Sequence, residues 1–78
     1  MNEEEELDMT MIKSEMAGTV WKVLVKEGDK VEIGQEVVII ESMKMEIPVE
    51  SEIAGTVKAV ITKPEDFVNV DDDLVEIE

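Results

Sequence analysis

Residues 12–41 and 49–78 are two copies of one pattern, and this internal repeat restricts the possible folds more than any other feature of the chain. The two segments align without a gap at an offset of 37 positions, and 13 of the 30 aligned positions are identical. The first copy reads IKSEMAGTVWKVLVKEGDKVEIGQEVVIIE and the second reads VESEIAGTVKAVITKPEDFVNVDDDLVEIE. Such agreement indicates two copies of one structural unit.

Each copy has the pattern of short β-strands. Val and Ile are frequent, Gly, Pro or Asp interrupts the apolar runs, and no run has the length and period of a helix. The spacing of Val20, Val23 and Val25 changes from three residues to two, which predicts a β-bulge that bends the strand. We predict strands near 11–14, 18–25, 30–33, 36–42, 45–50, 55–62, 67–70 and 74–78.

Neither copy can bury its apolar face alone, so we expect the two to share one core. The predicted fold is all-β: a flattened barrel or sandwich of two four-stranded antiparallel sheets, related by an internal two-fold axis. Only residues 42–48 separate the copies, so the axis should pass near this joint. The joint is then a tight hairpin at one end of the molecule, and the chain termini lie at the opposite end.

The composition excludes most catalytic chemistry. The chain has 78 residues, which predicts one domain, and it contains no Cys and no His. Disulfides, thiolate zinc sites and nucleophile–histidine pairs are therefore absent from the 78 residues. We predict neither a catalytic residue nor a metal site. The acidic run 71–73 lacks the spacing of a calcium loop, so we interpret it as a solvated turn.

The chain carries a formal net charge of −14, which argues against binding to nucleic acids or anionic membranes. No apolar run reaches membrane-spanning length, and residues 1–10 form an acidic segment unlike a secretory signal. We expect residues 1–10 to be a disordered tail, residues 11–78 to be the folded domain, and the protein to be cytoplasmic. The single tryptophan, Trp21, is expected to pack at a sheet edge.

The segment ESMKME, residues 41–46, lies at the joint between the two copies. Two-residue hairpins favour Asn-Gly or Asp-Gly, whereas this turn offers Met43 and Lys44. Residues that break local rules are frequent at functional sites. On spacing alone two interpretations stay open: exposed methionines that serve recognition beside a functional lysine, or a solvated lysine with Met43 and Met45 folded over the end of the barrel.

The segment ESMKMEIP resembles the attachment hairpin of biotinyl domains, the carrier modules of biotin-dependent carboxylases. The flanking segments GTVWKVLVKEGDKVEIGQEVVIIE and AGTVKAVITKPEDFVNVDDDLVEIE resemble the same family, so the resemblance covers roughly residues 12–78. Small stand-alone biotin/lipoyl attachment proteins consist of little else.

The resemblance implies that Lys44 carries covalent biotin, attached by a biotin protein ligase that recognises Met43 and Met45. Glu41 and Glu46 flank the turn and could shape recognition, or could be ordinary solvated charges. A biotin carboxylase and a carboxyltransferase are the implied partner enzymes, and the domain in isolation is expected to be a monomer. Because the chemistry belongs to the cofactor and the partners, this chain is a carrier and not an enzyme.

Two alternatives remain within the same fold. Lipoyl domains, which serve 2-oxo-acid dehydrogenase or glycine-cleavage systems, usually carry Asp-Lys-Ala at this turn, so the methionines favour biotin over lipoate. An interaction module with an unmodified lysine would have no need for the Met-Lys-Met sequence.

The second copy departs from the family at two turns. Glu65 and Asp71 replace glycines found at the equivalent positions of the first copy, Gly28 and Gly34. If these glycines adopt positive φ, the two acidic residues must do so at some cost, or the turns must differ.

Overall fold

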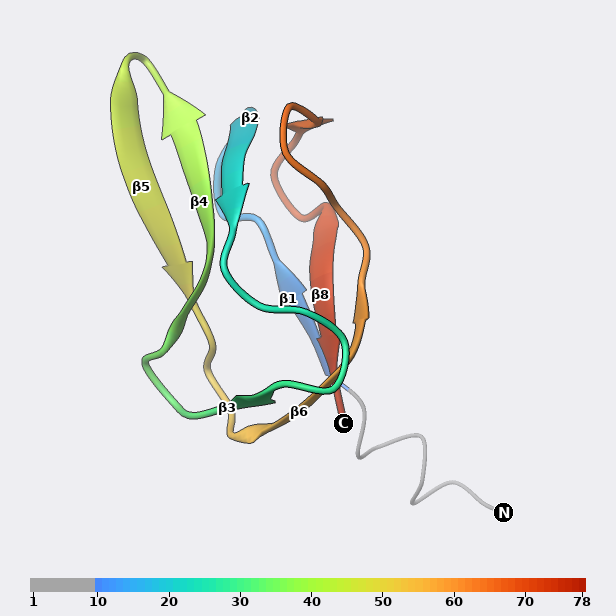
Figure 1. Cartoon of the computed structure of the whole chain (residues 1–78). Coiled ribbons are helices and arrows are strands. Elements are labelled where there is room, and N and C mark those ends of the chain that lie inside the picture. Colours follow the sequence, from blue (N-terminus) through green and yellow to red (C-terminus); the bar gives the residue numbers. More distant parts are fainter. Residues whose placement is uncertain (1–9) are drawn as a thin grey trace.

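The computed structural model describes residues 10–78, and these residues form eight β-strands and no helix (Figure 1). No helix in residues 10–78 is long and apolar enough to cross a membrane. The eight predicted strands are confirmed, with ends that differ by at most two residues. The strands are β1 (Thr10–Lys13), β2 (Gly18–Val23), β3 (Lys30–Val31), β4 (Glu36–Ser42), β5 (Met45–Glu50), β6 (Gly55–Val60), β7 (Phe67–Val68) and β8 (Asp73–Ile77).

The predicted boundary between tail and domain needs one small correction. Thr10, which we assigned to the tail, is the first residue of β1 and is paired with Ile77 of β8. The rest of the predicted tail, residues 1–9, lies outside the described residues.

The strands form two four-stranded antiparallel sheets related by the repeat. One sheet has the order β1-β8-β6-β3 and the other has the order β5-β4-β2-β7. An offset of 37 residues converts each strand of the first sheet into the strand at the same place in the second. The all-β sandwich with an internal two-fold axis is therefore confirmed.

A bulge bends β2, and the same bulge recurs in β6. The pairing of β2 with β4 shifts between Val20 and Lys22, and the pairing of β6 with β8 shifts between Val57 and Ala59. The extra residue at the first bulge is Trp21, whose side chain stays 41% exposed and stacks against the Lys22 ammonium, 4.6 Å from the ring centroid. Trp21 is thus partly covered and partly exposed.

The core lies between the two sheets and draws on both copies of the repeat. Ser14 and Ser51 are the buried hydroxyls at equivalent positions, and each donates a hydrogen bond of 2.6 Å to the carbonyl two residues further along. These bonds satisfy polar groups that would otherwise be costly to bury. The buried apolar side chains are Ile12, Val20, Val25, Val31, Val37, Val38, Ile40, Val57, Val68, Leu74, Val75 and Ile77.

Two pairs of equivalent turns each contain a residue with positive φ. Gly28 and Gly34 have φ of 94° and 87°, and their equivalents Glu65 and Asp71 have φ of 77° and 74°. Of the two alternatives, positive φ at the acidic residues or turns that differ, the structure has the first. A left-handed conformation costs an L-residue about 1–2 kcal/mol, so the second copy is the more strained half.

The acidic run 71–73 takes part in ordinary turn and strand contacts. The Asp72 carboxylate accepts a 2.8 Å hydrogen bond from the Asn69 N–H, and the Asp73 carboxylate pairs with Lys13 at 2.6 Å. Residues 10–78 contain no cluster of three or more carboxylates arranged to hold a metal ion.

Candidate functional site

The joint between the two copies is a two-residue hairpin at one end of the molecule (Figure 1). Glu41 pairs with Glu46 and Ser42 pairs with Met45, so only Met43 and Lys44 remain in the turn. Their φ angles are 54° and 67°, which is the pattern of a type I′ turn. This turn matches the right-handed twist of the strands, but its two central residues are ones that rarely adopt positive φ.

The side chains at the turn point into solvent. Met43 is 91% exposed, and Lys44 and Met45 are also exposed. Within residues 10–78, the Lys44 ammonium makes no ion pair. The alternative in which the methionines fold over the end of the barrel is therefore wrong.

Glu41 and Glu46 lie directly opposite each other on the stem of the hairpin, and both are exposed. Residues that pair directly across antiparallel strands have their side chains on the same face of the sheet, and like charges so placed repel each other. Neither carboxylate forms an ion pair within the described part of the chain. The stem thus presents two uncompensated negative charges close to the lysine.

An exposed aromatic ring that the sequence analysis did not identify lies in the same row. Thr19 of β2 pairs with Glu41 on one side and with Phe67 of β7 on the other, so the row crosses the whole sheet. Phe67 is 64% exposed. Its repeat equivalent is Lys30, a solvated residue, and that substitution was the one signal for exposure in the sequence.

Gly18 lets the stem of the hairpin pack closely against β2. A β-carbon at Gly18 would lie 2.6 Å from the backbone oxygen of Glu41 and 2.7 Å from the Ile40 side chain. Both distances are well below van der Waals contact. The absence of a side chain at Gly18 therefore fixes where β4, and with it the turn, can lie.

The chemistry available at this site is that of an exposed primary amine. Once deprotonated, the Lys44 Nζ atom can act as a nucleophile toward an activated carboxyl group. The described residues around the turn supply no imidazole or thiol that could accept its proton. What the site offers is an exposed amine at the end of a hairpin.

The sequence matches the protein family described as "Biotin-requiring enzyme" over residues 5–77. It is 63% identical over 38 residues to the biotin/lipoyl attachment protein of Bacillus subtilis (strain 168), an alignment that covers 49% of this chain and 52% of that protein. It is 60% identical over 35 residues to the methylmalonyl-CoA carboxyltransferase 1.3S subunit of Propionibacterium freudenreichii subsp. shermanii, covering 45% of this chain and 28% of the subunit. The chain thus matches about half of these relatives' length or less.

Two solved structures show the same fold. The Kluyveromyces lactis urea carboxylase matches with a TM-score of 0.85 and 37% identity, over 91% of this chain and 6% of the carboxylase. A single-chain, multi-domain long-chain acyl-CoA carboxylase matches with a TM-score of 0.82 and 28% identity, over 88% of this chain and 7% of the enzyme. In both proteins the matching part is a small segment of a large chain.

Proposed function

The chain belongs to the family of biotin-requiring enzymes, and from this membership we propose that it is a biotin carrier that receives the cofactor on Lys44. The observation that carries the proposal is the turn itself. Lys44 is the exposed central residue of a two-residue hairpin, between two exposed methionines, at the joint of the two repeats.

The turn fits the covalent attachment of biotin. In the attachment step, the Lys44 nitrogen attacks the carboxyl carbon of biotin that a biotin protein ligase has activated as an adenylate. The new amide bond replaces the bond to AMP, which leaves, and the ligase accepts the proton from the amine. Because the turn is exposed on a narrow hairpin, a ligase can enclose it without unfolding the domain.

We assign the recognition of this lysine to Met43 and Met45. Their exposed thioether side chains are polarisable and adaptable, and such side chains suit a partner surface. The carboxylates of Glu41 and Glu46 can add electrostatic complementarity, which sets association rate and specificity more than affinity. The ligase is thus proposed to recognise the hairpin and its stem.

The carrier role needs the rest of the domain to stay rigid while the modified side chain moves. Attached biotin supplies the group that accepts and releases a carboxyl group, while the chemistry takes place on partner enzymes. The sandwich holds the lysine at one pole, and the strand ends near residue 77 lie at the other. We propose a biotin carboxylase and a carboxyltransferase as partners, and a monomeric, cytoplasmic carrier.

The experiment is intact-mass spectrometry of the purified chain after co-expression with an active biotin ligase, with biotin and lipoate both supplied. The expected result is one biotinyl addition on the wild-type chain. Lys44→Arg should remove that addition, and the matched control Lys30→Arg, which changes another exposed lysine, should retain it.

Each other outcome contradicts part of the proposal. A lipoyl addition would keep the carrier role and reject biotin. A biotinyl addition that persists in Lys44→Arg would reject the site. A folded protein with no addition would reject the carrier role itself.

A further inference from the structure

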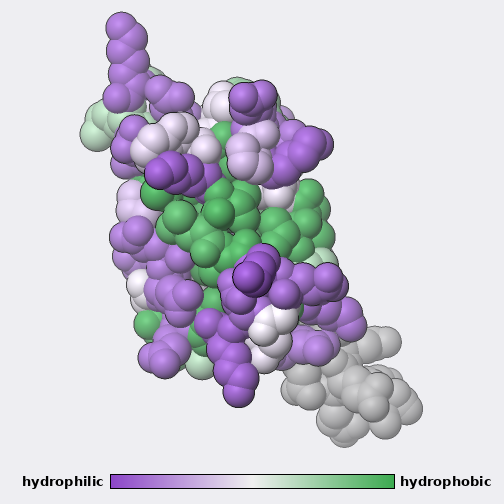
Figure 2. Space-filling view, in the orientation of Figure 1, coloured by the Kyte–Doolittle hydropathy of each residue, from purple (hydrophilic) through white to green (hydrophobic). Residues whose placement is uncertain are grey.

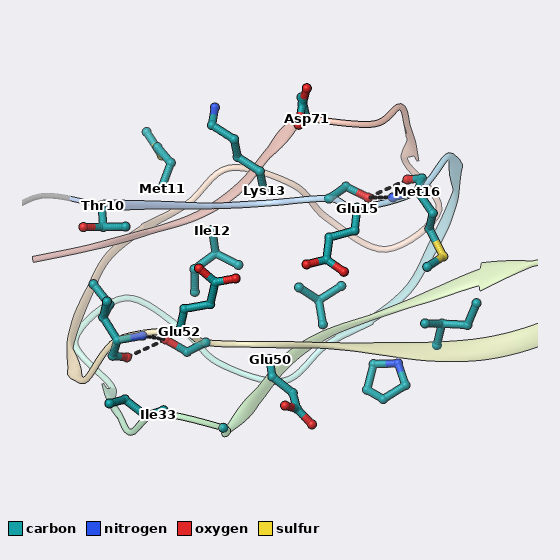
Figure 3. A pocket seen from close by; sticks show the side chains of 17 residues that line it. Thr10, Met11, Ile12, Lys13, Glu15, Met16, Ile33, Glu50, Glu52 and Asp71 are labelled. Atoms are coloured by element: carbon teal, nitrogen blue, oxygen red, sulfur yellow. Dashed lines mark hydrogen bonds between the residues drawn. The ribbon is translucent and has the colours of Figure 1, made fainter.

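A groove runs between the two edge strands of the sandwich, away from the lysine turn. β1 pairs only with β8, and β5 pairs only with β4, among the described residues, so each leaves one edge without a hydrogen-bonding neighbour. These two edges line a groove of about 680 Å³, shown in Figure 3. Its two walls, residues 10–16 and 47–53, are equivalent segments of the repeat, so the two-fold axis passes through it.

The floor of the groove is partly apolar. Ile12 of β1 points into it, and its repeat equivalent Val49 of β5 is partly buried against the core (Figure 3). Met16 and Ile53 line its ends and also pack against the core. An apolar surface of this kind gains free energy when another apolar side chain covers it.

Two carboxylates point into the groove from opposite walls. Glu15 and Glu52 are repeat equivalents, and Figure 3 shows both side chains directed into the space between the strands. The hydrogen bonds of Ser14 and Ser51 with the residues two positions later span these glutamates and fix their backbone.

The groove has no positive charge to balance these carboxylates. Lys13 is the lysine among the residues that line it, and its ammonium points away and pairs with Asp73 at 2.6 Å (Figure 3). A cationic segment would therefore find two unpaired negative charges there.

We propose that this groove docks an extended basic segment of a partner protein, which adds as a strand to the free edge of β1. β1 is the edge that pairs because β5 contains Pro48, which lacks a backbone N–H and is typical of edges that resist pairing. The strand's apolar side chains, on its inner face, cover Val49, and its lysine or arginine side chains, at the alternate positions, are long enough to reach back to Glu15 and Glu52. Addition of a peptide strand to a sheet edge is an established mode of recognition.

The charge of the chain decides between possible occupants. A second copy would bring another net charge of −14, and the chain's own N-terminal segment contains four consecutive glutamates, so both are repelled. A basic segment is instead attracted by the whole molecule.

The face away from the groove carries two lysines and one carboxylate, Lys26, Lys63 and Glu27, around its depression. Figure 2 shows a contiguous hydrophobic area on the face that Figure 1 presents, between the segments that follow β2 and β6. The shallow depression there is lined by Val23, Val60 and the equivalent lysines Lys26 and Lys63. A basic segment should therefore select the groove and leave this face free.

The test is an NMR titration of the isotope-labelled, full-length chain with a blocked six-residue peptide of alternating lysine and valine. We expect amide shifts within residues 10–16 and 47–53. The double substitution Glu15→Gln with Glu52→Gln should weaken binding roughly 3- to 30-fold, because two exposed charge pairs are lost. The matched control Glu27→Gln with Glu32→Gln changes the net charge equally outside the groove and should leave affinity within about twofold.

N-methylated peptides test the strand addition itself. One version of the peptide carries N-methyl groups on its odd residues and the other on its even residues. Because alternate N–H groups of an extended strand point to opposite edges, each version blocks one edge of the peptide strand. A strand paired with β1 predicts that one version binds about tenfold or more weakly and that the other binds nearly as well as the parent, because only one edge faces β1. Equal loss or equal retention in the two versions would overturn the proposal.

Three further outcomes would also overturn it: shifts centred on Lys26 and Lys63, equal weakening in both double variants, or equal binding by a peptide of alternating glutamate and valine. Lys44→Arg should bind the peptide like the wild type. The docking proposal can therefore be rejected without affecting the carrier proposal, and the carrier proposal can be rejected without affecting the docking proposal.

Discussion

Replacing Gly18 by alanine should displace the hairpin that presents Lys44. The new β-carbon would lie 2.6 Å from the Glu41 backbone oxygen, whereas carbon–oxygen contacts between neighbouring strands are about 3.3–3.6 Å. One of the two strands must therefore move by roughly 0.7 Å or more. The Ile40 side chain, 2.7 Å from the same position, is in the core and cannot easily give way.

The cost of this overpacking is about 1–3 kcal/mol. Alanine recovers part of it, about 0.5–1 kcal/mol, because it loses less backbone entropy than glycine on folding. The net loss is then about 1 kcal/mol, with a range up to about 2.5 kcal/mol, and a loss of 1 kcal/mol lowers the Tm of a domain of this size by about 4–8 °C. Thermal unfolding followed by circular dichroism measures this shift directly.

The repeat provides a matched control in Gly55→Ala. A β-carbon there would lie 2.6 Å from the Ile77 side chain and 2.7 Å from the Glu78 backbone oxygen, so the crowding is nearly the same. This crowding occurs at the pole opposite the turn. Both variants should lose similar stability, and only Gly18→Ala should also slow biotinylation, by about threefold or more, because small displacements of a reacting group are costly.

The assay is the initial rate of biotinylation at a temperature where both variants are fully folded. Equal slowing in the two variants would assign the effect to lost stability and refute a positional role for Gly18. An unchanged Tm in Gly18→Ala would refute the close approach itself.

Three further predictions concern single contacts. Glu65→Gly should raise the free energy of unfolding by about 0.5–1 kcal/mol in urea titrations, since glycine tolerates the φ of 77° at that position; no gain would show that the turn is not strained. A hydrogen bond to Asp73, together with the charge of that carboxylate, raises the pKa of Lys13, so this pair stabilises the fold fully below the unfolded-state pKa and loses its effect as pH rises through the folded-state value. The gap in urea midpoint between wild type and Asp73→Asn should close in the alkaline range, above about pH 10.4, and a gap that persists well beyond that pH would contradict the linkage. Lys44→Arg should leave the Tm within about 2 °C, because an exposed side chain without an ion pair contributes little; a larger loss would contradict the exposed position.

The internal repeat predicted the fold well because equivalent residues of the two copies must be buried in the same core. Both copies must bury the same apolar positions, so a single axis relates the sheets and places the joint at one end. The bulge after Val20 was predictable for the same reason, since the shift in apolar spacing must be absorbed by an extra residue in the strand. The positive φ at Glu65 and Asp71 followed from the glycines at their equivalents.

The groove and the exposed aromatic ring could not be predicted in this way. Whether a strand lies at an edge depends on which strand is beside it, and the apolar pattern of β1 is compatible with an edge or a central position. The outward position of Phe67 likewise depends on its pairing with Thr19, two strands from the turn. The partial exposure of Trp21 depends on the bulge, because the residue inserted at a bulge is freed from the alternation of the strand.

Positive φ at the 43–44 turn does not by itself indicate function, because other turns of the domain have it too. Glu65 and Asp71 have similar positive φ. Their turns are supported by carboxylates, since Asp66 accepts a hydrogen bond of 3.1 Å from the Lys63 N–H and Asp72 accepts one of 2.8 Å from the Asn69 N–H. No side-chain hydrogen bond of this kind supports the 43–44 turn in the described structure. Glycine at position 43 would relieve the strain, yet an exposed methionine is present. A residue that neither stabilises its turn nor packs on the domain is best explained by contact with another protein.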